Sequence, residues 1–354
     1  MTAPRFSARG KPGRKRRRRA GADDGSKPMQ MVPDVEFDTY YNRPVVKAPP
    51  WEWPIAAYLF LGGAAGGSAI LGLGAQLTGR PTLRRNSRLA ALGTAGAGSL
   101  ALIVDLGRPE RLFNMFRVFK PSSPMNMGSW LLAAFGTTSG VAAAAELDEL
   151  TGRKIPLPDM LRNTLKLAAS PAGAVTGVLG APLAVYTAIL FSDTAVPAWN
   201  SAKDHLPFLF VSSAAAASGG LAMITTPVEE TGPARGFAVL GAVGDVAATK
   251  IQDARMEEVS NEPYRSGKPG RLLKWAERLV VAGGVGAAVG GRSRVIAGLS
   301  GAALLAGSAL TRFGVLEAGL ASVRDPKYVV DPQKCRLEER RRAGTVDDSI
   351  TTVG

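Results

Sequence analysis

Long apolar segments alternate with short charged loops along the chain from Trp51 onward. A membrane-spanning helix needs about 20 mostly apolar residues. Eight segments come close to that length or exceed it, at 54–78, 88–106, 127–146, 165–191, 206–226, 234–249, 271–290 and 295–316. Asp245 interrupts the sixth segment, and Lys274, Glu277 and Arg278 enter the seventh, so six or seven spans stay open as alternatives. The pattern predicts an all-α polytopic membrane protein with about eight transmembrane helices.

Ala, Gly and Ser are the main residues of the predicted spans. Such a composition lets membrane helices approach one another closely. In the first span, Gly62 and Gly66 stand four residues apart, as do Gly63 and Gly67. This spacing indicates helix contact and not phosphate binding, since no strand precedes the glycines. Buried helices of a large soluble domain are the alternative, and the length of the apolar segments disfavours it.

Basic residues are concentrated at the two ends of the chain, which has a formal net charge of +14. The first 50 residues contain the run RKRRRR. This run could bind nucleic acid or anionic lipid, but it is typical of a disordered basic tail at the cytoplasmic membrane surface. No apolar stretch precedes residue 54, so we expect no signal peptide. We predict a basic tail at 1–50, a transmembrane domain at 51–320 and a polar tail at 321–354, with lipid and no nucleic acid as a partner.

Both termini lie on one side of the membrane if the chain has eight spans. Lys and Arg are more frequent on that side, which the positive-inside rule assigns to the cytoplasm. The excess comes from the two tails, whereas the internal loops of the two sides are level. We therefore predict a multi-pass protein of the cytoplasmic membrane with both termini in the cytoplasm. Acidic residues of the opposite side, such as Glu146 and Asp148, are expected mostly in loops.

The second apolar segment ends in the sequence DLGRPER. Asp105 and Arg108 stand three residues apart, the spacing at which side chains of the last helical turn meet. Pro109 is expected to stop the helix after them. Charges at membrane depth usually face a bundle interior or a water-filled cavity, so we predict a polar pocket open toward the side of the termini. An isolated basic residue such as Arg312 is interpreted instead as a snorkelling side chain at the interface.

Aromatic residues on the side of the termini complete the predicted pocket. Trp51 and Trp53 precede the first span and are typical of an interfacial aromatic belt. Tyr58 lies about one turn deeper, where a phenol needs a hydrogen-bond partner. Tyr186 lies near the end of the fourth span. Because consecutive spans alternate in direction, Tyr58, Asp105 and Tyr186 all fall near the same side.

Ligands for a redox metal are scarce in the sequence. Cys335 is the one cysteine and His205 the one histidine. An iron–sulfur cluster takes about four thiolates, and a bis-histidine haem needs a second histidine. We therefore expect no haem and no iron–sulfur cluster in this chain, so that any electron transfer must use an organic cofactor and a partner protein.

Four stretches together resemble the NrfD/polysulfide reductase membrane-subunit family: WPIAAYLFLGGAAGG, DLGRPERLFNMFRVFKPSSPMNMGSW, SPAGAVTGVLGAPLAVYTAIL and DPKYVVDPQKCR. The resemblance runs from about Trp51 to Arg336, and its second stretch is the most specific. Membrane subunits of this family have eight or more helices, bind a quinone and lack haem. The resemblance implies helices in two packed bundles and a quinone site, for menaquinone or ubiquinone, at the end of the first bundle.

The resemblance also implies roles for individual residues. A family histidine that contacts the quinone falls on Tyr58 here, and a tyrosine still donates a hydrogen bond but is a poorer proton acceptor at neutral pH. Asp105 would exchange the proton, and Arg108 would set the charge and geometry of that carboxylate. Tyr186 would form the far wall of the site, and Trp53 is included as a further cofactor contact.

The predicted function is that of a quinone-reactive membrane anchor, a non-metal subunit of a multi-subunit oxidoreductase. The resemblance implies a ferredoxin-like iron–sulfur subunit and a molybdenum or tungsten catalytic subunit as partners, with a formate dehydrogenase-type complex preferred. We expect the partner to face the basic residues Arg108, Arg111, Arg117 and Lys120. The alternatives are a secondary transporter and a purely structural anchor. A transporter should show two related halves, and no convincing internal repeat is present.

Overall fold

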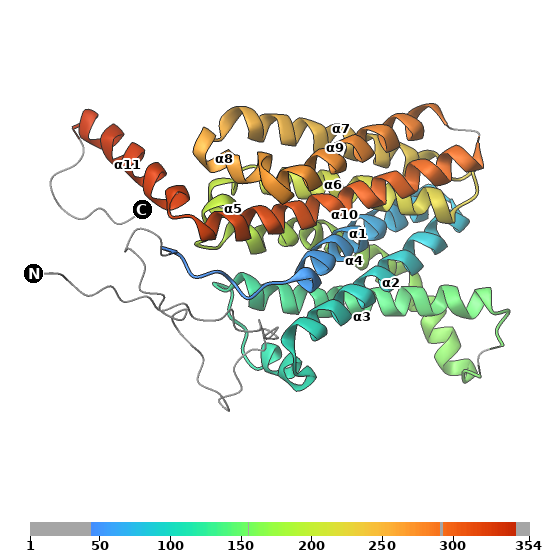
Figure 1. Ribbon diagram of the computed structural model, residues 1–354. Coiled ribbons are helices and arrows are strands. Elements are labelled where there is room, and N and C mark those ends of the chain that lie inside the picture. The colour runs from blue at the N-terminus through green and yellow to red at the C-terminus, as the bar shows by residue number, and fades with distance from the viewer. Residues whose placement is uncertain (1–43, 155, 291–292, 345–354) are drawn as a thin grey trace, which may run out of the picture.

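The computed structural model describes residues 44–154, 156–290 and 293–344. In these ranges the chain is helical, with eight long helices and several short ones (Figure 1). The long helices are α1 (Trp53–Leu77), α2 (Pro81–Leu106), α3 (Pro124–Leu150), α4 (Asp159–Ser192), α6 (Leu206–Thr225), α7 (Gly232–Arg255), α9 (Gly267–Val289) and α10 (Arg294–Arg324). The shorter ones are the 3-10 helix η2 (Pro109–Phe116), α5 (Pro197–Ser201), α8 (Glu258–Arg265) and α11 (Lys327–Arg342).

The eight long helices form two packed bundles. Helices α1 to α4 make the first bundle, and α6, α7, α9 and α10 make the second. Helix α1 also packs against α6 and α10, so it lies between the bundles (Figure 1). The all-α polytopic fold predicted from the apolar pattern is confirmed, since six of these helices are long and apolar enough to cross a membrane. Helices α7 and α9, the two segments interrupted by charges, fall outside that set.

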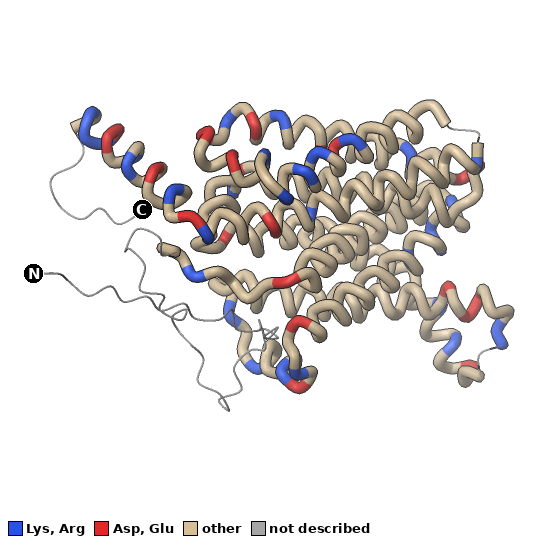
Figure 2. The backbone as a smooth tube through the Cα atoms, in the orientation of Figure 1, with Lys and Arg blue, Asp and Glu red and all other residues tan. Residues whose placement is uncertain are grey.

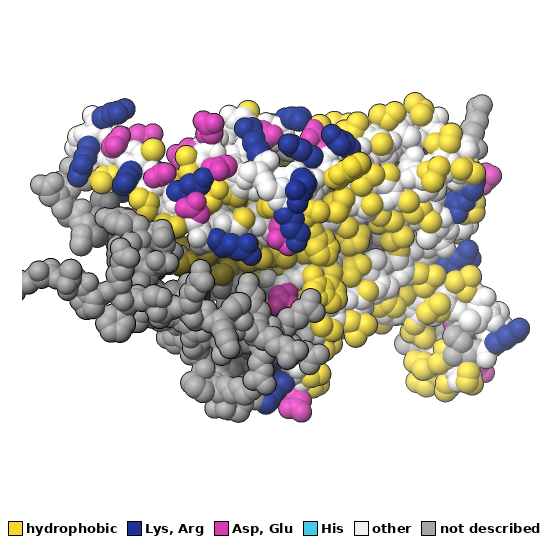
Figure 3. Space-filling view, in the orientation of Figure 1, with side chains coloured by type: hydrophobic (Ala, Val, Ile, Leu, Met, Phe, Trp, Pro, Cys, Tyr) yellow, Lys and Arg dark blue, Asp and Glu magenta, His cyan; other side chains and the backbone are white. Residues whose placement is uncertain are grey.

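The charged residues lie mainly at the two ends of the helices, with a long apolar zone between them (Figure 2; Figure 3). One end holds η2, α5, α8 and α11, and we call it the α11 end. The other end, where α1 meets α2 and α3 meets α4, is called the opposite end. This distribution fits a protein whose middle section faces lipid.

Prolines and one glycine set the limits of several helices. Pro54, Pro81 and Pro124 each lie in a first helical turn, where the missing N–H costs no hydrogen bond. Ser123 caps the start of α3, because its hydroxyl accepts a hydrogen bond from the Asn126 N–H. Helix α2 ends at Leu106, and the next residue, Gly107, is left-handed with φ 67°.

Small residues allow α1 to contact both bundles closely, as their spacing predicted. A Cβ at Gly66 would collide with the backbone oxygen of Gly180 in α4. A Cβ at Gly67 would collide with Ser218 in α6. These two glycines therefore hold α1 against α4 on one side and against α6 on the other.

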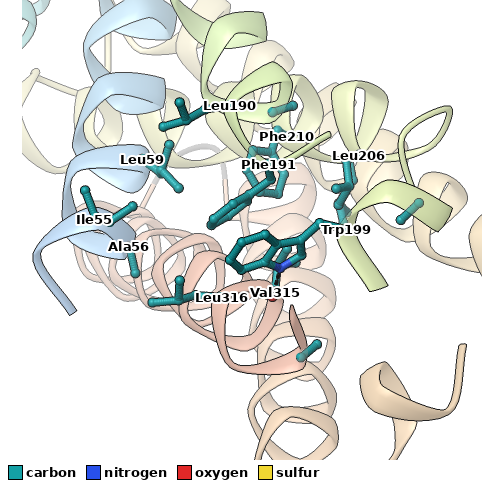
Figure 4. Packing of buried hydrophobic residues seen from close by; sticks show 14 of the residues in the cluster. Ile55, Ala56, Leu59, Leu190, Phe191, Trp199, Leu206, Phe210, Val315 and Leu316 are labelled. Atoms are coloured by element: carbon teal, nitrogen blue, oxygen red, sulfur yellow. Dashed lines mark hydrogen bonds between the residues drawn. The ribbon is translucent and has the colours of Figure 1, made fainter. Parts of the chain in front are cut away.

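An aromatic cluster joins the bundles at the α11 end (Figure 4). Trp199 of α5 is fully buried and stacks on Phe191 of α4, with ring centroids 4.3 Å apart. Its indole N–H donates a hydrogen bond to the Val315 carbonyl of α10 at 2.7 Å. Trp51 is partly buried and stacks on Trp199 at 5.4 Å, and the predicted interfacial belt stays a prediction. Trp53, by contrast, is 59% exposed.

The two predicted tails differ in how much of them the structure describes. The basic tail at 1–50 lies outside the described residues except for its last seven, 44–50. In the polar tail at 321–354, α10 continues to Arg324 and α11 then extends beyond the bundles (Figure 1). The predicted domain limits remain predictions.

Candidate functional site

A cavity of about 250 Å³ lies at the α11 end of the first bundle. Elements α1, α2, η2, α3 and α4 all contribute to its walls. Its lining is Trp51, Ile55, Tyr58, Ser99, Leu102, Ile103, Asp105, Leu106, Leu112, Met115, Phe116, Met125, Gly128, Ser129, Leu132, Ala133, Tyr186 and Leu190. Three residues that the sequence placed on one side, Tyr58, Asp105 and Tyr186, are thus brought together in one site.

Glycines of neighbouring helices make room for the two tyrosines. Tyr58 and Tyr186 are 2% and 8% exposed, so neither ring can turn out into solvent. A Cβ at Gly128 of α3 would overlap the Tyr186 ring, and a Cβ at Gly98 of α2 would lie 3.4 Å from Tyr58 Cδ2. The packing therefore fixes where each phenol lies within the cavity wall.

The end of α2 separates Asp105 from Arg108. Asp105 is half-buried on the last turn of the helix, where it lines the cavity. Gly107 turns the chain two residues before Pro109, and its N–H caps the helix on the Val104 carbonyl at 3.3 Å. Arg108 consequently has extended backbone, with φ −128° and ψ 111°, and is exposed outside the cavity lining. The prediction that the two residues share a helical turn is wrong, because a left-handed glycine ended the helix first.

Helix η2 forms the outer wall of the cavity through Leu112, Met115 and Phe116. Asn126 of α3 holds this wall in place. Its side-chain NH₂ group donates to the carbonyls of Met115 and Val118, both at 2.9 Å, and its side-chain oxygen accepts from the Lys120 N–H at 2.7 Å. The sequence analysis did not identify Asn126, although a polar side chain in the first turn of a predicted span indicates a contact with the preceding loop.

The tryptophan at the cavity is Trp51 and not Trp53. Trp53 was predicted as a cofactor contact, but it lies outside the cavity lining. Helix α1 begins at Trp53, so Trp51 lies in extended chain before the helix and turns inward over the cavity. A difference of two positions at a helix start changes the direction of a side chain completely.

The lining is mainly apolar, with Asp105, Tyr58, Tyr186 and two serines as its polar groups. An apolar pocket with a few convergent polar groups is the usual form of a small-molecule site. A flat, apolar ring with polar oxygens fits this lining, since phenols can donate to the oxygens and a carboxylate can exchange a proton. Among the described residues, no group of three or more His, Cys, Asp or Glu side chains could hold a metal ion.

A buried ion network at the opposite end of the first bundle was not predicted. Glu146 and Asp148 lie in α3 at 2% and 3% exposure, so Glu146 is in a helix as the segment 127–146 predicted, whereas the loop position expected for Asp148 is wrong. Glu146 accepts hydrogen bonds from Arg84 and Arg88, both at 2.8 Å, and Arg88 also donates to the Gln76 side chain at 2.6 Å. The network joins α1, α2 and α3, and its basic members lie in the first turns of α2, which begins at Pro81, ahead of the predicted segment 88–106.

Arg312 was predicted to snorkel at the interface, and this is wrong. The residue is fully buried in α10. Its guanidinium lies 3.8 Å from the centroid of the Phe210 ring and donates a hydrogen bond to the Phe210 carbonyl at 2.8 Å. The partners on α6 are distant in sequence, so the local pattern around Arg312 did not reveal them.

Two comparisons with known proteins agree on the family of the first bundle. The family model described as polysulphide reductase, NrfD, matches residues 42–229, which contain α1 to α6 and the whole cavity lining. The C subunit of the polysulfide reductase of Wolinella succinogenes is similar to this chain, with 31% identity over 182 residues. The match covers 48% of this chain and 57% of that protein, so the chain spans little more than half the length of its curated relative.

Proposed function

We propose that this chain, which belongs to the NrfD polysulphide reductase family, is the quinone-reactive membrane subunit of a multi-subunit oxidoreductase. The observation that carries the proposal is the cavity that brings Tyr58, Asp105 and Tyr186 together within the region matched by the family. Electrons would pass between menaquinone or ubiquinone in the cavity and an iron–sulfur partner subunit. A molybdenum or tungsten subunit would complete the complex.

Some residues of the cavity would bind the quinone, and another would exchange its protons. A bound quinone supplies the electron-carrying chemistry and takes up protons when it is reduced. Tyr58 would donate a hydrogen bond to a carbonyl oxygen of the ring, and Tyr186 would bound the ring from α4. Asp105 is half-buried at the end of α2, so it can exchange protons with both the cavity and water at the α11 end.

The proposed partner would dock on the α11 end. Arg108, Arg111, Arg117 and Lys120 all lie in or beside η2, the outer wall of the cavity. An acidic surface on an iron–sulfur subunit would complement these cations and bring its cluster near the cavity. In this arrangement Arg108 serves the interface and the electrostatic environment of Asp105, and it is not a member of the cavity wall.

The nature of the catalytic partner is a further part of the proposal. The relative in Wolinella succinogenes is named as a component of polysulfide reductase. For this chain we favour a formate dehydrogenase-type partner, since cytoplasmic termini would place the α11 end on the cytoplasmic side. A reporter fused after Gly354 tests this orientation, because it should be active only in its cytoplasmic form.

Purification of the native complex tests the proposal directly. We expect an iron–sulfur subunit to co-purify with the chain, with cluster absorbance and co-extracted quinone in the same fraction. If the chain purifies alone and vesicles that contain it take up a substrate, the protein is a transporter. If partners co-purify but the complex neither retains nor reduces a quinone, it is a structural anchor.

A further inference from the structure

A second cavity, of about 370 Å³, lies at the α11 end of the second bundle. Helices α6, α7, α8, α9 and α10 line it, and it shares no lining residue with the cavity of the first bundle. Its walls are much more polar and include Thr249, Gln252, Lys274 and Thr311. Two ion pairs lie at its walls, Lys250 with Glu277 at 2.7 Å and Arg265 with Asp253 at 3.2 Å.

Asp245 is the buried carboxylate of this cavity. It is 4% exposed, and its Oδ2 has no hydrogen-bond partner among the described residues. The residue lies ten positions before Arg255, the end of α7, which corresponds to a depth of about 15 Å along the helix. A buried carboxylate with an unpartnered oxygen is costly unless water or a proton compensates it. A polar cavity of this volume can hold water.

Arg312 is the buried cation that acts on Asp245. Its Nη2 donates to the Phe210 carbonyl, whereas its Nε and Nη1 have no hydrogen-bond partner among the described residues. A Cβ at Gly63 of α1 would lie 3.4 Å from Arg312 Nη2. The guanidinium therefore lies at the junction of the two bundles, against the helix that carries Tyr58.

The other charged groups around Asp245 come from three helices. Helix α9 contributes Glu277 and Lys274, α7 contributes Lys250 and Asp253, and α8 contributes Tyr264 and Arg265. Helix α6 contributes the Ser213 hydroxyl, which carries no charge and hydrogen-bonds with the Ser308 hydroxyl at 2.9 Å. Lys250 is paired with Glu277 and Arg265 with Asp253, so Arg312 and Lys274 are the remaining cations among these groups.

We infer that Asp245 is a proton-binding site, which water reaches from the α11 end through the cavity of the second bundle. The proton comes from that water and returns to it, and no electron moves. A proton on the carboxyl group would remove the cost of a buried charge, and water in the cavity could deliver it. Protonation removes the charge that balances Arg312, so the change acts at the junction with α1. The inference does not depend on quinone binding and stands apart from the proposed function.

Infrared difference spectroscopy of the full-length protein in lipid discs tests proton binding. As the pH falls, we expect a carboxyl C=O band to appear, to shift in D₂O and to be absent from Asp245→Asn. Asp245→Glu, which keeps a titratable group, should restore a band at a shifted position. Asp193→Asn is the control, since Asp193 is an exposed carboxylate at the same end of the molecule, and it should leave the band unchanged. A band that persists in Asp245→Asn, or the absence of any band in the unsubstituted protein, would overturn the inference.

Thiol labelling tests the access of water. In a Cys335→Ser background, Gln252→Cys should react with a small hydrophilic thiol reagent, because Gln252 lines the cavity. Ser308→Cys is the control, because Ser308 is 1% exposed and lies outside the lining. Reaction of Gln252→Cys at a rate at least tenfold above that of Ser308→Cys supports the water path. Equal protection of both cysteines means that the cavity is closed to water, and the inference then fails.

Discussion

Gly128→Ala is the sharpest single test of the cavity in the first bundle. Gly128 lies in α3 directly against the ring of Tyr186, and a Cβ there would overlap the ring carbons and the phenol oxygen. Tyr186 is 8% exposed, so its ring cannot avoid the new methyl group by turning into solvent. The ring must instead move into the cavity, or α3 and α4 must separate locally.

The expected loss of stability or of quinone affinity depends on whether the helices separate or the ring moves. Overpacking a well-packed core by one methyl group costs about 1–3 kcal/mol in unfolding free energy. If the ring moves instead, it occupies part of a cavity of about 250 Å³ and removes space from the ligand. A loss of about 1.4 kcal/mol in binding free energy corresponds to a tenfold weaker affinity, which we take as the minimum expected for the quinone.

Gly136→Ala is the matched control, because Gly136 lies two turns further along α3 and a Cβ there would have no atom within 4 Å. It should leave quinone affinity unchanged, and it should be neutral or stabilise the helix by about 0.5–1 kcal/mol. The assays are thermal unfolding followed by circular dichroism, and the KM for a soluble quinone analogue in the intact complex. Truncation of the ring in Gly128→Ala/Tyr186→Leu should recover the stability. If Gly128→Ala behaves like Gly136→Ala in both assays, Tyr186 does not lie where the structure has it.

Three further predictions concern the polar groups of the first bundle. Asp105→Asn should slow electron transfer to quinone by roughly 10²–10⁴-fold and leave transfer to an artificial dye intact. The control Asp193→Asn, at an exposed position, should change neither rate. An equal loss of both rates in Asp105→Asn would mean an assembly defect. Tyr58→Phe should weaken quinone binding by about 0.5–1.5 kcal/mol, measured as a change in Kd, and an unchanged Kd would remove the proposed hydrogen bond. Glu146→Gln should destabilise the folded protein by about 3–5 kcal/mol, because it leaves Arg88 buried without its carboxylate; a thermal midpoint within a degree of the unsubstituted protein would contradict this.

The helices could be predicted because their signal is local. A run of about 20 apolar residues identifies a span wherever its partners lie, and all eight predicted segments are helices. The limits were less accurate where charges belong to the helix. Helix α2 begins at Pro81 and not at residue 88, and its first turns carry Arg84 and Arg88, which bind Glu146 of α3 across the bundle. A basic residue next to an apolar run looks like a loop residue when its partner lies far away in the sequence.

The candidate site could be predicted in part for the same reason. The alternating direction of the spans was enough to place Tyr58, Asp105 and Tyr186 at one end. It could not give the positions of Trp53 and Arg108. Trp53 depends on where α1 begins, and Arg108 depends on the left-handed conformation of Gly107. The residue at which a helix begins or ends depends on the backbone conformation, which the spacing of residue types does not reveal.

Helix α1 lies between the cavity of the first bundle and the buried Arg312 of α10, although it lines no part of the second cavity. Its Tyr58 lines the cavity of the first bundle, and its Gly63 faces the guanidinium of Arg312. Five residues separate these positions, which is about 7.5 Å along a helix. Helix α1 is also tightly held, with 78% of its apolar window buried and its Gly66 in contact with α4. The packing therefore holds Tyr58 and the contact with Arg312 on one closely packed helix, so substitutions at Gly63 or Gly66 should disturb the positions of both.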